Sequence, residues 1–194
     1  SEEALNQLWI EFIKYRIIYD FEYWAYSFIF IKDKVSPKDI PFKLNRAQRR
    51  VLNKLEKLRK AGKPIKFILL KARQWGGSTL VQIYMLWIML VHRRNWNTVI
   101  CGDVETQSRN VRAMITKALN KYPSYLLGET VKFTPFEGSS KNKVIQNTNC
   151  VVSIGSFQKP DTLRSGDISG AHLTEIGLWR ATPGKKPEDL IQSI

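Results

Sequence analysis

The sequence predicts an α/β fold in which helices flank a mainly parallel sheet. From residue 65 onward, short apolar runs typical of buried strands alternate with longer helical patterns. A glycine loop with basic and hydroxyl residues joins the first such strand to the first such helix, which is the layout of a phosphate-binding (P-loop) site. The 194 residues suffice for one domain with a sizeable core. We therefore expect a P-loop domain that carries an N-terminal helical appendage.

The appendage is expected over residues 1–41 and the main domain over residues 42–194. Apolar residues recur at helical spacing from Leu5 to Ile13, and ten aromatic residues lie between Trp9 and Phe30. We interpret this segment as an amphipathic helix packed on the main domain, in preference to a base-stacking or membrane surface. Residues 35–42 contain two prolines and are expected to form a linker.

A second helix is expected from Leu44 to Lys60, because apolar residues recur on one side of it. Its other side is basic: Arg46, Arg49, Arg50, Lys54, Lys57 and Lys60. The segment 61–64, with a glycine followed by a proline, ends this helix.

The remaining elements are expected in a fixed order along the chain. They are strand 65–70, helix 79–92, strand 97–101, helix 106–121, a hairpin of 131–133 with 143–146, strand 150–154 and strand 170–173. Ligands of parallel sheets bind beyond the carboxyl ends of the strands. Residues 71–79 and the pair Thr174-Glu175 both follow such ends, so we place the functional site there.

The loop departs from the usual G-x-x-x-x-G-K-[ST] pattern, because Gly77 stands where the lysine belongs and the nearest lysine is Lys71. Gly76 and Gly77 permit close backbone approach to phosphate, and the Ser78 hydroxyl is placed to meet Mg²⁺. The predicted nucleotide-binding residues of the loop are Lys71, Ala72, Arg73, Gln74, Trp75, Gly76, Gly77, Ser78 and Thr79. The alternative is a basic turn between a strand and a helix.

An acidic residue follows the last strand. Glu175 is placed to polarise a water molecule for attack on a γ-phosphate, and Thr174 stands where an aspartate usually anchors the metal. Ser78 and Thr174 are therefore the predicted metal-site residues, and ATP with Mg²⁺ the predicted cofactors. Arg164 is a candidate to stabilise phosphoryl oxygens. The amide of Gln48 is a candidate adenine contact.

The charge balance predicts a polyanionic partner. Lys and Arg number 31 against 17 Asp and Glu, a net charge of +14, which favours nucleic acid or an anionic membrane surface. The apolar run at 80–91 is too short to span a bilayer. We expect Cys101 and Cys150 to be buried and reduced, as in an intracellular protein.

Together these motifs resemble the ATPase domain of the large terminase subunit, the DNA-packaging motor of tailed double-stranded DNA phages. The loop Lys71–Thr79 fits that family's K-x-R-Q-x-G-x-S-T pattern, and residues 172–179 fit its apolar-His-Leu-Ser/Thr-Glu motif with a following tryptophan. The resemblance implies an ASCE or RecA-like P-loop NTPase in which Glu175 activates water. It makes Gln48 the adenine contact. Arg164 would be an arginine finger acting in trans, with Arg73 as the rival acting within its own subunit.

The resemblance also implies a function and partners. It implies an ATP hydrolase that drives double-stranded DNA into a procapsid in the host bacterial cytoplasm. The partners would be DNA, the capsid portal protein and the small terminase subunit, in a homo-oligomeric ring on the portal or as a monomer in isolation, with no membrane. The family's coupling motif and nuclease domain would lie beyond residue 194, so no DNA cleavage is expected of this chain.

Two alternatives stay open. A helicase-like remodelling ATPase would share the fold, but it would normally keep the loop lysine at position 77 and an aspartate at position 174. A non-enzymatic nucleic-acid-binding module with a degenerate loop would explain Gly77 and Thr174. The presence of Lys71, Ser78 and Glu175 together disfavours it.

Overall fold

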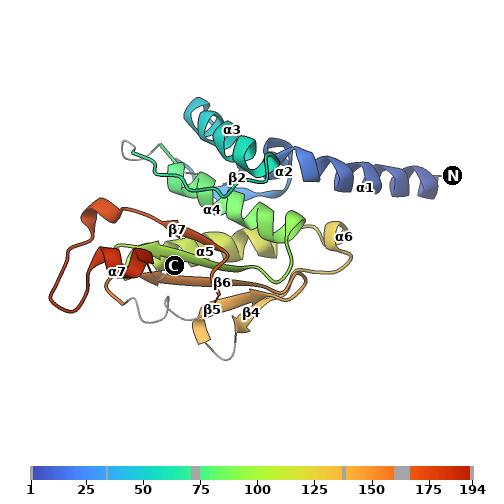
Figure 1. Cartoon of the computed structure of the whole chain (residues 1–194). Helices are drawn as coiled ribbons and strands as arrows, with labels where there is room; N and C mark the ends of the chain where they lie inside the picture. The colour runs from blue at the N-terminus through green and yellow to red at the C-terminus, as the bar shows by residue number, and fades with distance from the viewer. Residues whose placement is uncertain (1, 34, 71–74, 137–138, 160–166, 193–194) are drawn as a thin grey trace.

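The computed structural model describes residues 2–33, 35–70, 75–136, 139–159 and 167–192 (Figure 1). Two sheets and a set of helices make up this part of the chain. In chain order the elements are α1 (Glu2–Tyr19), α2 (Phe21–Phe28), β1 (Phe30–Lys32), β2 (Asp39–Pro41), α3 (Arg46–Lys60), α4 (Gly77–Trp87), the π-helix η1 (Ile88–His92), β3 (Asn97–Gly102), α5 (Glu105–Asn120), α6 (Ser124–Leu127), β4 (Phe133–Phe136), β5 (Ser139–Ile145), β6 (Cys150–Ser156), β7 (Gly170–Leu173), the 3₁₀ helix η3 (Ile176–Leu178) and α7 (Pro187–Gln192).

The main sheet has the strand order β4-β5-β6-β3-β7. Strand β3 pairs in parallel with both β6 and β7, whereas β5 pairs antiparallel with β4 and β6. The sheet is therefore mixed, and the expectation of a mainly parallel sheet holds for only half of its pairings. The difference comes from the hairpin of β4 and β5, because strands joined by a tight turn can pair only antiparallel.

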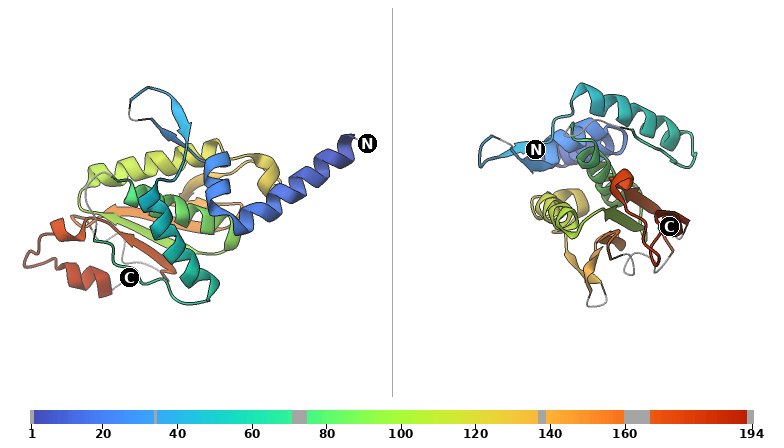
Figure 2. Two further views of the ribbon diagram at one scale, coloured as in Figure 1. Left: turned by 90° about the horizontal axis from the view of Figure 1, so that it is seen from above. Right: turned by 90° about the vertical axis from the view of Figure 1, so that its left-hand side faces the viewer.

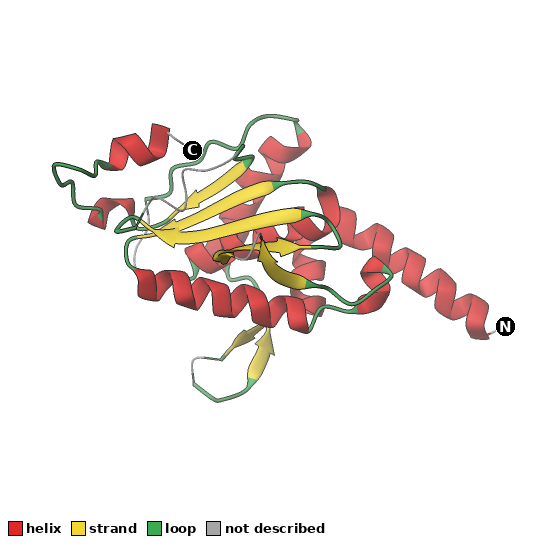
Figure 3. Ribbon diagram, turned by 90° about the horizontal axis from the view of Figure 1, so that it is seen from below, coloured by secondary structure: helices red, strands yellow, loops and turns green. Residues whose placement is uncertain are grey.

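The two faces of this sheet bury different partners (Figure 3). Because side chains alternate along a strand, Ile100 of β3 points to one face while Val99 and Cys101 point to the other. Ile100 joins the large core with residues of α4 and α5, which lie over that face. Val99 and Cys101 pack in a smaller cluster with Phe157, Trp179 and Leu190. The C-terminal segment therefore covers the second face.

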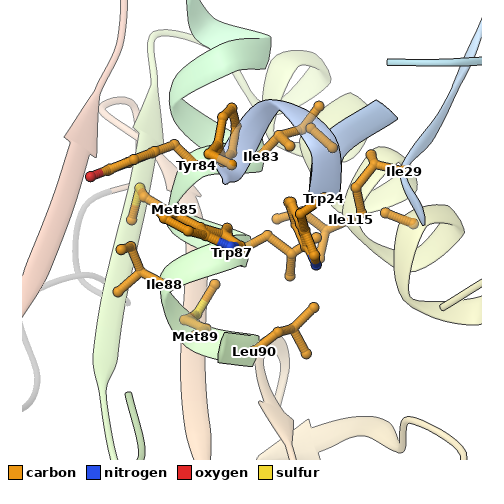
Figure 4. Close-up of a cluster of buried hydrophobic side chains, with 14 of the residues drawn as sticks. Trp24, Ile29, Ile83, Tyr84, Met85, Trp87, Ile88, Met89, Leu90 and Ile115 are labelled. Atoms are coloured by element: carbon orange, nitrogen blue, oxygen red, sulfur yellow. The ribbon is translucent and has the colours of Figure 1, made fainter. Parts of the chain in front are cut away.

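The large core is centred on α4 and η1, which are apolar on all sides (Figure 4). A helix that is apolar all round is a buried helix. Trp87 is fully buried, and its indole Nε1 donates to the Ile17 carbonyl of α1 at 2.8 Å. Trp24 of α2 is also fully buried and donates to the Tyr122 hydroxyl at 2.9 Å. These contacts confirm that part of the N-terminal aromatic segment packs on the main domain.

The N-terminal segment forms two helices rather than one. Asp20 separates them: its side chain accepts a hydrogen bond from the Tyr23 N–H at 2.8 Å and so caps α2. The expected linker contains a short strand, β2, which pairs antiparallel with β1 in a small hairpin. Helix α1 projects away from the body of the molecule, as Figures 1 and 2 show from different directions.

The strand expected at residues 65–70 is absent from the structure. These residues form no regular element, and the side chains of Ile68 and Leu70 are each 99% exposed. A strand needs a neighbour that satisfies its backbone groups. In the part of the chain that the structure describes, β7 pairs only with β3, and no strand lies beside residues 65–70. The outer edge of β7 is left unpaired among the described residues, so the apolar composition of residues 65–70 does not produce a strand.

The other expected elements are confirmed, with small shifts of their ends. Helix 79–92 begins two residues earlier, at Gly77, and its last turn widens into η1. Cys101 and Cys150 are free and buried. Among the described residues, no helix combines the length and the hydropathy that a bilayer span requires. The division at residue 41 stays a prediction.

Candidate functional site

The start of α4 and the end of β7 meet at one edge of the sheet. Strands β3 and β7 run in parallel, and the Thr174 N–H extends their ladder by donating to the Cys101 carbonyl at 2.9 Å. This bond places the Thr174 side chain over the start of α4, where its Oγ1 lies 3.1 Å from the Ser78 Oγ. The two predicted metal-site residues, 96 positions apart in sequence, are therefore in contact.

Side chains at the start of α3 hold the last residues of the loop, Trp75 and Gly76, in place. Gly76 is the N-cap of α4 and has a left-handed backbone with φ of +83°. Its carbonyl accepts a hydrogen bond from the Gln48 amide at 3.0 Å, and the Trp75 carbonyl accepts one from the Asn45 amide at 3.0 Å. Asn45 and Gln48 also form the capping box of α3. The same two side chains thus begin α3 and fix the backbone that leads into α4.

Gln48 has little freedom in this position. Its side chain amide donates to Gly76 and accepts from the Asn45 N–H at 2.9 Å, and the residue is only 4% exposed. A Cβ atom at Gly76 would lie 2.7 Å from the Gln48 Nε2, so this contact requires glycine. The structure gives Gln48 a role in supporting the loop. Its role as an adenine contact stays a prediction.

Glu175 follows directly after Thr174 and has an unusual backbone. Its φ of 60° and ψ of 33° lie in the left-handed region, where residues other than glycine are uncommon. Here it begins η3, and its exposed carboxylate accepts a hydrogen bond from the amide of Gln107. The carboxylate therefore lies at the same sheet edge as the hydroxyl pair and is held from α5.

Gln107 is the functional candidate that the sequence analysis missed. Its Oε1 accepts the Asp103 N–H at 3.1 Å while its Nε2 donates to Glu175, so both ends of the amide are used. The side chain lies against Gly102, where a Cβ atom would come within 2.7 Å of its Oε1. A signal was present: α5 begins directly after β3, so the first polar residues of α5 belong to the carboxyl edge of the sheet.

The hydroxyl pair suits a hard divalent cation. Mg²⁺ binds oxygen at about 2.1 Å in an octahedron, so neighbouring ligands lie roughly 3 Å apart. The oxygens of Ser78 and Thr174 are 3.1 Å apart and share a hydrogen bond in which either hydroxyl can donate, and this separation also suits two neighbouring ligands of such an ion. Among the described residues, no group of three His, Cys, Asp or Glu side chains gathers as a metal site. A cation held here would take its remaining oxygens from phosphate and water.

Two hollows flank the sheet. One of about 590 Å³ lies beyond the ends of β3 and β6, next to the site, and Asp103, Phe157, Arg180 and Lys185 are among its lining residues. The other, of about 550 Å³, lies beside the amino end of β7, and neither hollow is lined by a predicted site residue. Burial raises the pKa of the Cys101 thiol to about 12, so this cysteine is unreactive despite its place at the end of β3.

The outer side of α3 is basic, as expected. Arg49 is engaged by Glu22, with Nε 2.8 Å from Oε1, and Lys60 lies 3.9 Å from Glu56. Within the described residues, the exposed basic side chains without an acidic partner on this helix are Arg46, Arg50, Lys54 and Lys57. This row provides the unpaired positive charge expected of a surface that binds phosphates.

A partly buried polar cluster lies between α3 and α4. Glu56 accepts hydrogen bonds from Arg59 and from the Tyr84 hydroxyl, both at 2.7 Å. Burial opposes the ionisation of Glu56, but these hydrogen bonds outweigh it and lower the pKa of its carboxyl. His92 packs edge-on against Trp87, with ring centroids 4.3 Å apart. Burial, with the nearby Arg59 charge, lowers the pKa of His92 to about 4.

Several predicted residues lie outside the part of the chain that the structure describes. They are Lys71, Ala72, Arg73, Gln74 and Arg164. The described part brings together Gln48, Trp75, Gly76, Gly77, Ser78, Thr79, Thr174 and Glu175. Their assigned roles in binding and catalysis stay predictions.

Comparison with known proteins identifies the architecture. A scan against protein-family models and a search of curated proteins found no match. A crystal structure of the HK97 bacteriophage large terminase superposes on 93% of this chain with a TM-score of 0.66 and 19% sequence identity. The chain spans about a third of that terminase, since the match covers 34% of it. The protein therefore has a large-terminase-like α/β fold over nearly all of its length.

Proposed function

We propose that this chain is the ATP-hydrolysing part of a viral DNA-packaging motor, in which hydrolysis drives double-stranded DNA into a procapsid. The observation that carries the proposal is the contact of Ser78 with Thr174. A serine at the start of a helix behind a glycine loop and a threonine directly before an acidic residue are the two halves of an ATPase site. Their side chains meet although 96 residues separate them, at the carboxyl edge where such sheets bind ligands.

The described residues have distinct roles in this proposal. The N–H groups at the start of α4 face phosphate oxygens, aided by the positive end of the helix dipole. Ser78 and Thr174 would hold Mg²⁺, which would supply positive charge to offset that of the phosphates. Glu175 accepts a proton from the attacking water. Gln107 and the left-handed backbone of Glu175 fix the direction of that carboxylate.

Residues outside the described part of the chain supply the positive charges of the proposed site. Lys71 supplies the phosphate-binding cation in place of a lysine at position 77. An arginine, either Arg73 from the same subunit or Arg164 from a neighbour, stabilises the charge of the transferring phosphoryl group. The basic row of α3 contacts the DNA backbone, which a motor must grip without reading bases. The portal, the small terminase subunit and a ring of copies are the proposed partners, at the procapsid in the host cytoplasm.

The decisive experiment separates nucleotide binding from turnover. Fluorescent ATP binding and phosphate release are measured with Mg²⁺ for the wild type, Glu175→Gln and Lys71→Ala. We expect wild-type protein to bind ATP with Mg²⁺ and to hydrolyse it slowly. Glu175→Gln should bind ATP normally and release no phosphate, because the amide cannot accept the proton from water. Lys71→Ala should bind weakly.

A matched control and an opposing outcome complete the test. Glu188 lies in the first turn of α7 and contacts none of the site residues described above, so Glu188→Gln should hydrolyse ATP like the wild type. Turnover that rises more than linearly with protein concentration would favour Arg164 acting between subunits. Wild-type protein that neither binds nor hydrolyses ATP at high concentration would overturn the proposal in favour of a non-enzymatic nucleic-acid-binding module.

A further inference from the structure

Helix α1 carries an apolar stripe that the other described parts of the chain leave exposed. The stripe consists of Leu5, Leu8, Trp9, Phe12, Tyr15 and Tyr19, each between 50% and 68% exposed. The 3.6-residue repeat places all six on one side of the helix. The side next to the stripe packs on the main body, where Ile13 and Ile17 are buried. The apolar surface of α1 is therefore wider than its contact with the body, and the stripe is the part that stays exposed.

The position of α1 makes the stripe accessible to another molecule. Residues 2–9 are all exposed, and the amino-terminal half of the helix stands clear of the body in the views of Figures 1 and 2. Two aromatic pairs order the stripe: Trp9 stacks on Phe12 at 5.6 Å between centroids, and Tyr15 lies 5.1 Å from Tyr19. Large, ordered aromatic side chains of this kind are typical of interface anchors.

The charge of α1 argues against a polyanionic occupant. The chain has a net charge of +14, yet α1 contains three acidic and two basic residues and is slightly negative. Nucleic acid and anionic membranes are attracted by clustered positive charge, which α1 lacks. A protein surface of equally low charge suits the stripe better. A second α1 is such a surface, and its projection keeps the positive bodies of two molecules apart.

The order of residues along α1 is self-complementary in an antiparallel arrangement. The central residues Leu5, Leu8, Trp9 and Phe12 are placed symmetrically about a point between Leu8 and Trp9. Two antiparallel copies would therefore place Leu5 opposite Phe12 in both directions at once, with Leu8 and Trp9 of both copies at the centre of the contact. This is the relationship that a two-fold axis requires.

The flanking charges agree with this arrangement. Glu2 and Arg16 lie on the same flank of the stripe, at opposite ends of the helix. In an antiparallel pair, Glu2 of each copy would therefore lie near Arg16 of the other copy. Arg16 is held in position, because its Nη2 lies 3.3 Å from the Asp20 Oδ2 and its guanidinium stacks 3.8 Å above the Tyr23 ring. Its side chain stays 43% exposed and can accept a further carboxylate partner.

We propose that α1 is a two-fold dimerisation element, in which the apolar stripes of two copies of this chain pack antiparallel. The contact is independent of the proposed ATPase function and differs in symmetry from a ring contact. A two-fold contact closes at two copies, whereas a ring joins unlike surfaces head to tail. A helix pair is a small interface, so the dimer should form at micromolar or higher concentration.

Sedimentation velocity of the 194-residue chain tests the proposal, up to about 100 μM because small interfaces bind weakly. We expect the wild type to shift from monomer to dimer as its concentration rises. Trp9→Glu should stay monomeric, and Tyr26→Glu, an equally exposed aromatic of α2, should dimerise normally. Both variants should keep the wild-type melting temperature, because the changed side chains are exposed.

Charge exchange tests the antiparallel register. Glu2→Arg and Arg16→Glu should each weaken self-association, since like charges then face each other at both ends. An equimolar mixture of the two variants should dimerise again, because both end contacts become attractive in the mixed pair. A wild type that is monomeric throughout, or a Trp9→Glu variant that dimerises normally, would overturn the proposal. Binding of wild-type monomer to phosphatidylserine vesicles or duplex DNA that Trp9→Glu abolishes would assign the stripe to those partners instead.

Discussion

Gln107 donates a hydrogen bond from its amide to the carboxylate of Glu175, and it accepts one from the Asp103 N–H at 3.1 Å. The pair joins the first turn of α5 to the second residue after β7. An amide that is held at both ends has a fixed orientation, so it presents a donor to the carboxylate from one direction. The proposed base is therefore positioned by a residue from a different element.

We expect Gln107→Ala to lower kcat by about tenfold with little change in ATP affinity, the cost of one oriented hydrogen bond to a charged group. Gln107→Glu should be slower still, because a second carboxylate repels Glu175. Steady-state kinetics and a nucleotide-binding titration check this split. Thr106→Ala, on the exposed neighbouring position, serves as control. An equal loss of binding and turnover would indicate a structural role instead.

The hydroxyl of Thr174 is predicted to contribute to Mg²⁺ binding. Thr174→Ser keeps the oxygen that lies 3.1 Å from Ser78, whereas Thr174→Val removes it and nearly preserves the volume. We expect the serine variant to resemble the wild type and the valine variant to need about tenfold more Mg²⁺ for ATP binding, since one oxygen ligand is lost. A Mg²⁺ titration at fixed ATP gives the result. Equal Mg²⁺ dependence in both variants would exclude Thr174 from the metal site.

Gly76 is predicted to be the least replaceable glycine of the loop. Gly76→Ala meets two costs, a left-handed backbone and a Cβ atom 2.7 Å from the Gln48 amide. The backbone cost alone is about 1 kcal/mol. Gly62→Ala is a matched control, because Gly62 also has a positive φ, of +64°, but nothing lies within 4 Å of its Cβ position. Chemical denaturation should show the larger loss for Gly76→Ala, and equal losses would mean that Gln48 yields easily.

Stability should fall as the pH drops from the ordinary His92 pKa of 6.5 towards about 4, its value in the folded protein. Over this range the unfolded chain binds a proton that the folded protein excludes, so acid favours unfolding. The stabilising contribution is complete above pH 6.5 and is lost below about 4. His92→Phe keeps a ring against Trp87 and should flatten this dependence. Melting temperatures at several pH values test it, and an unchanged slope would contradict the assignment.

The basic row of α3 is predicted to contribute to duplex DNA binding. Arg50 has no acidic partner among the described residues, whereas the neighbouring Arg49 is paired with Glu22. Arg50→Ala should therefore weaken binding more than Arg49→Ala and lower the slope of log affinity against log salt by about 1. Fluorescence anisotropy at several salt concentrations measures both. Equal effects would place the DNA elsewhere on the molecule.

Much of the fold could be predicted from sequence patterns because those patterns reflect local physics. Helix α3 follows from its apolar spacing and from the glycine and proline of residues 61–64 that stop it, and β3, β6 and β7 follow from short apolar runs. The strand at 65–70 could not be predicted correctly in the same way. An apolar run specifies that a segment seeks burial, whereas strand formation also depends on a neighbour that is distant in sequence.

The residues of the candidate site that belong to sequence motifs could be predicted. The spacing of glycines and hydroxyl residues indicated Ser78, and the short strand before Thr174 indicated its partner. Gln107 belongs to no motif, because its role depends on the register of β3 beside β7 and on where α5 begins. The second use of Gln48, as a support for the Gly76 carbonyl, is likewise a tertiary contact that helical periodicity cannot reveal.

The attachment of α3 to the loop has a mechanical consequence. Asn45 and Gln48 donate hydrogen bonds to the carbonyls of Trp75 and Gly76, so the first turn of α3 is fixed to the backbone of the proposed phosphate-binding loop. The 15-residue helix extends about 22 Å from that point, at 1.5 Å per residue. A tilt of about 10° at the loop would carry the far end through roughly 4 Å, a distance comparable to the rise of one DNA base pair. In the proposed ATPase cycle, a movement of the loop would therefore be carried along α3 to its unpaired cations.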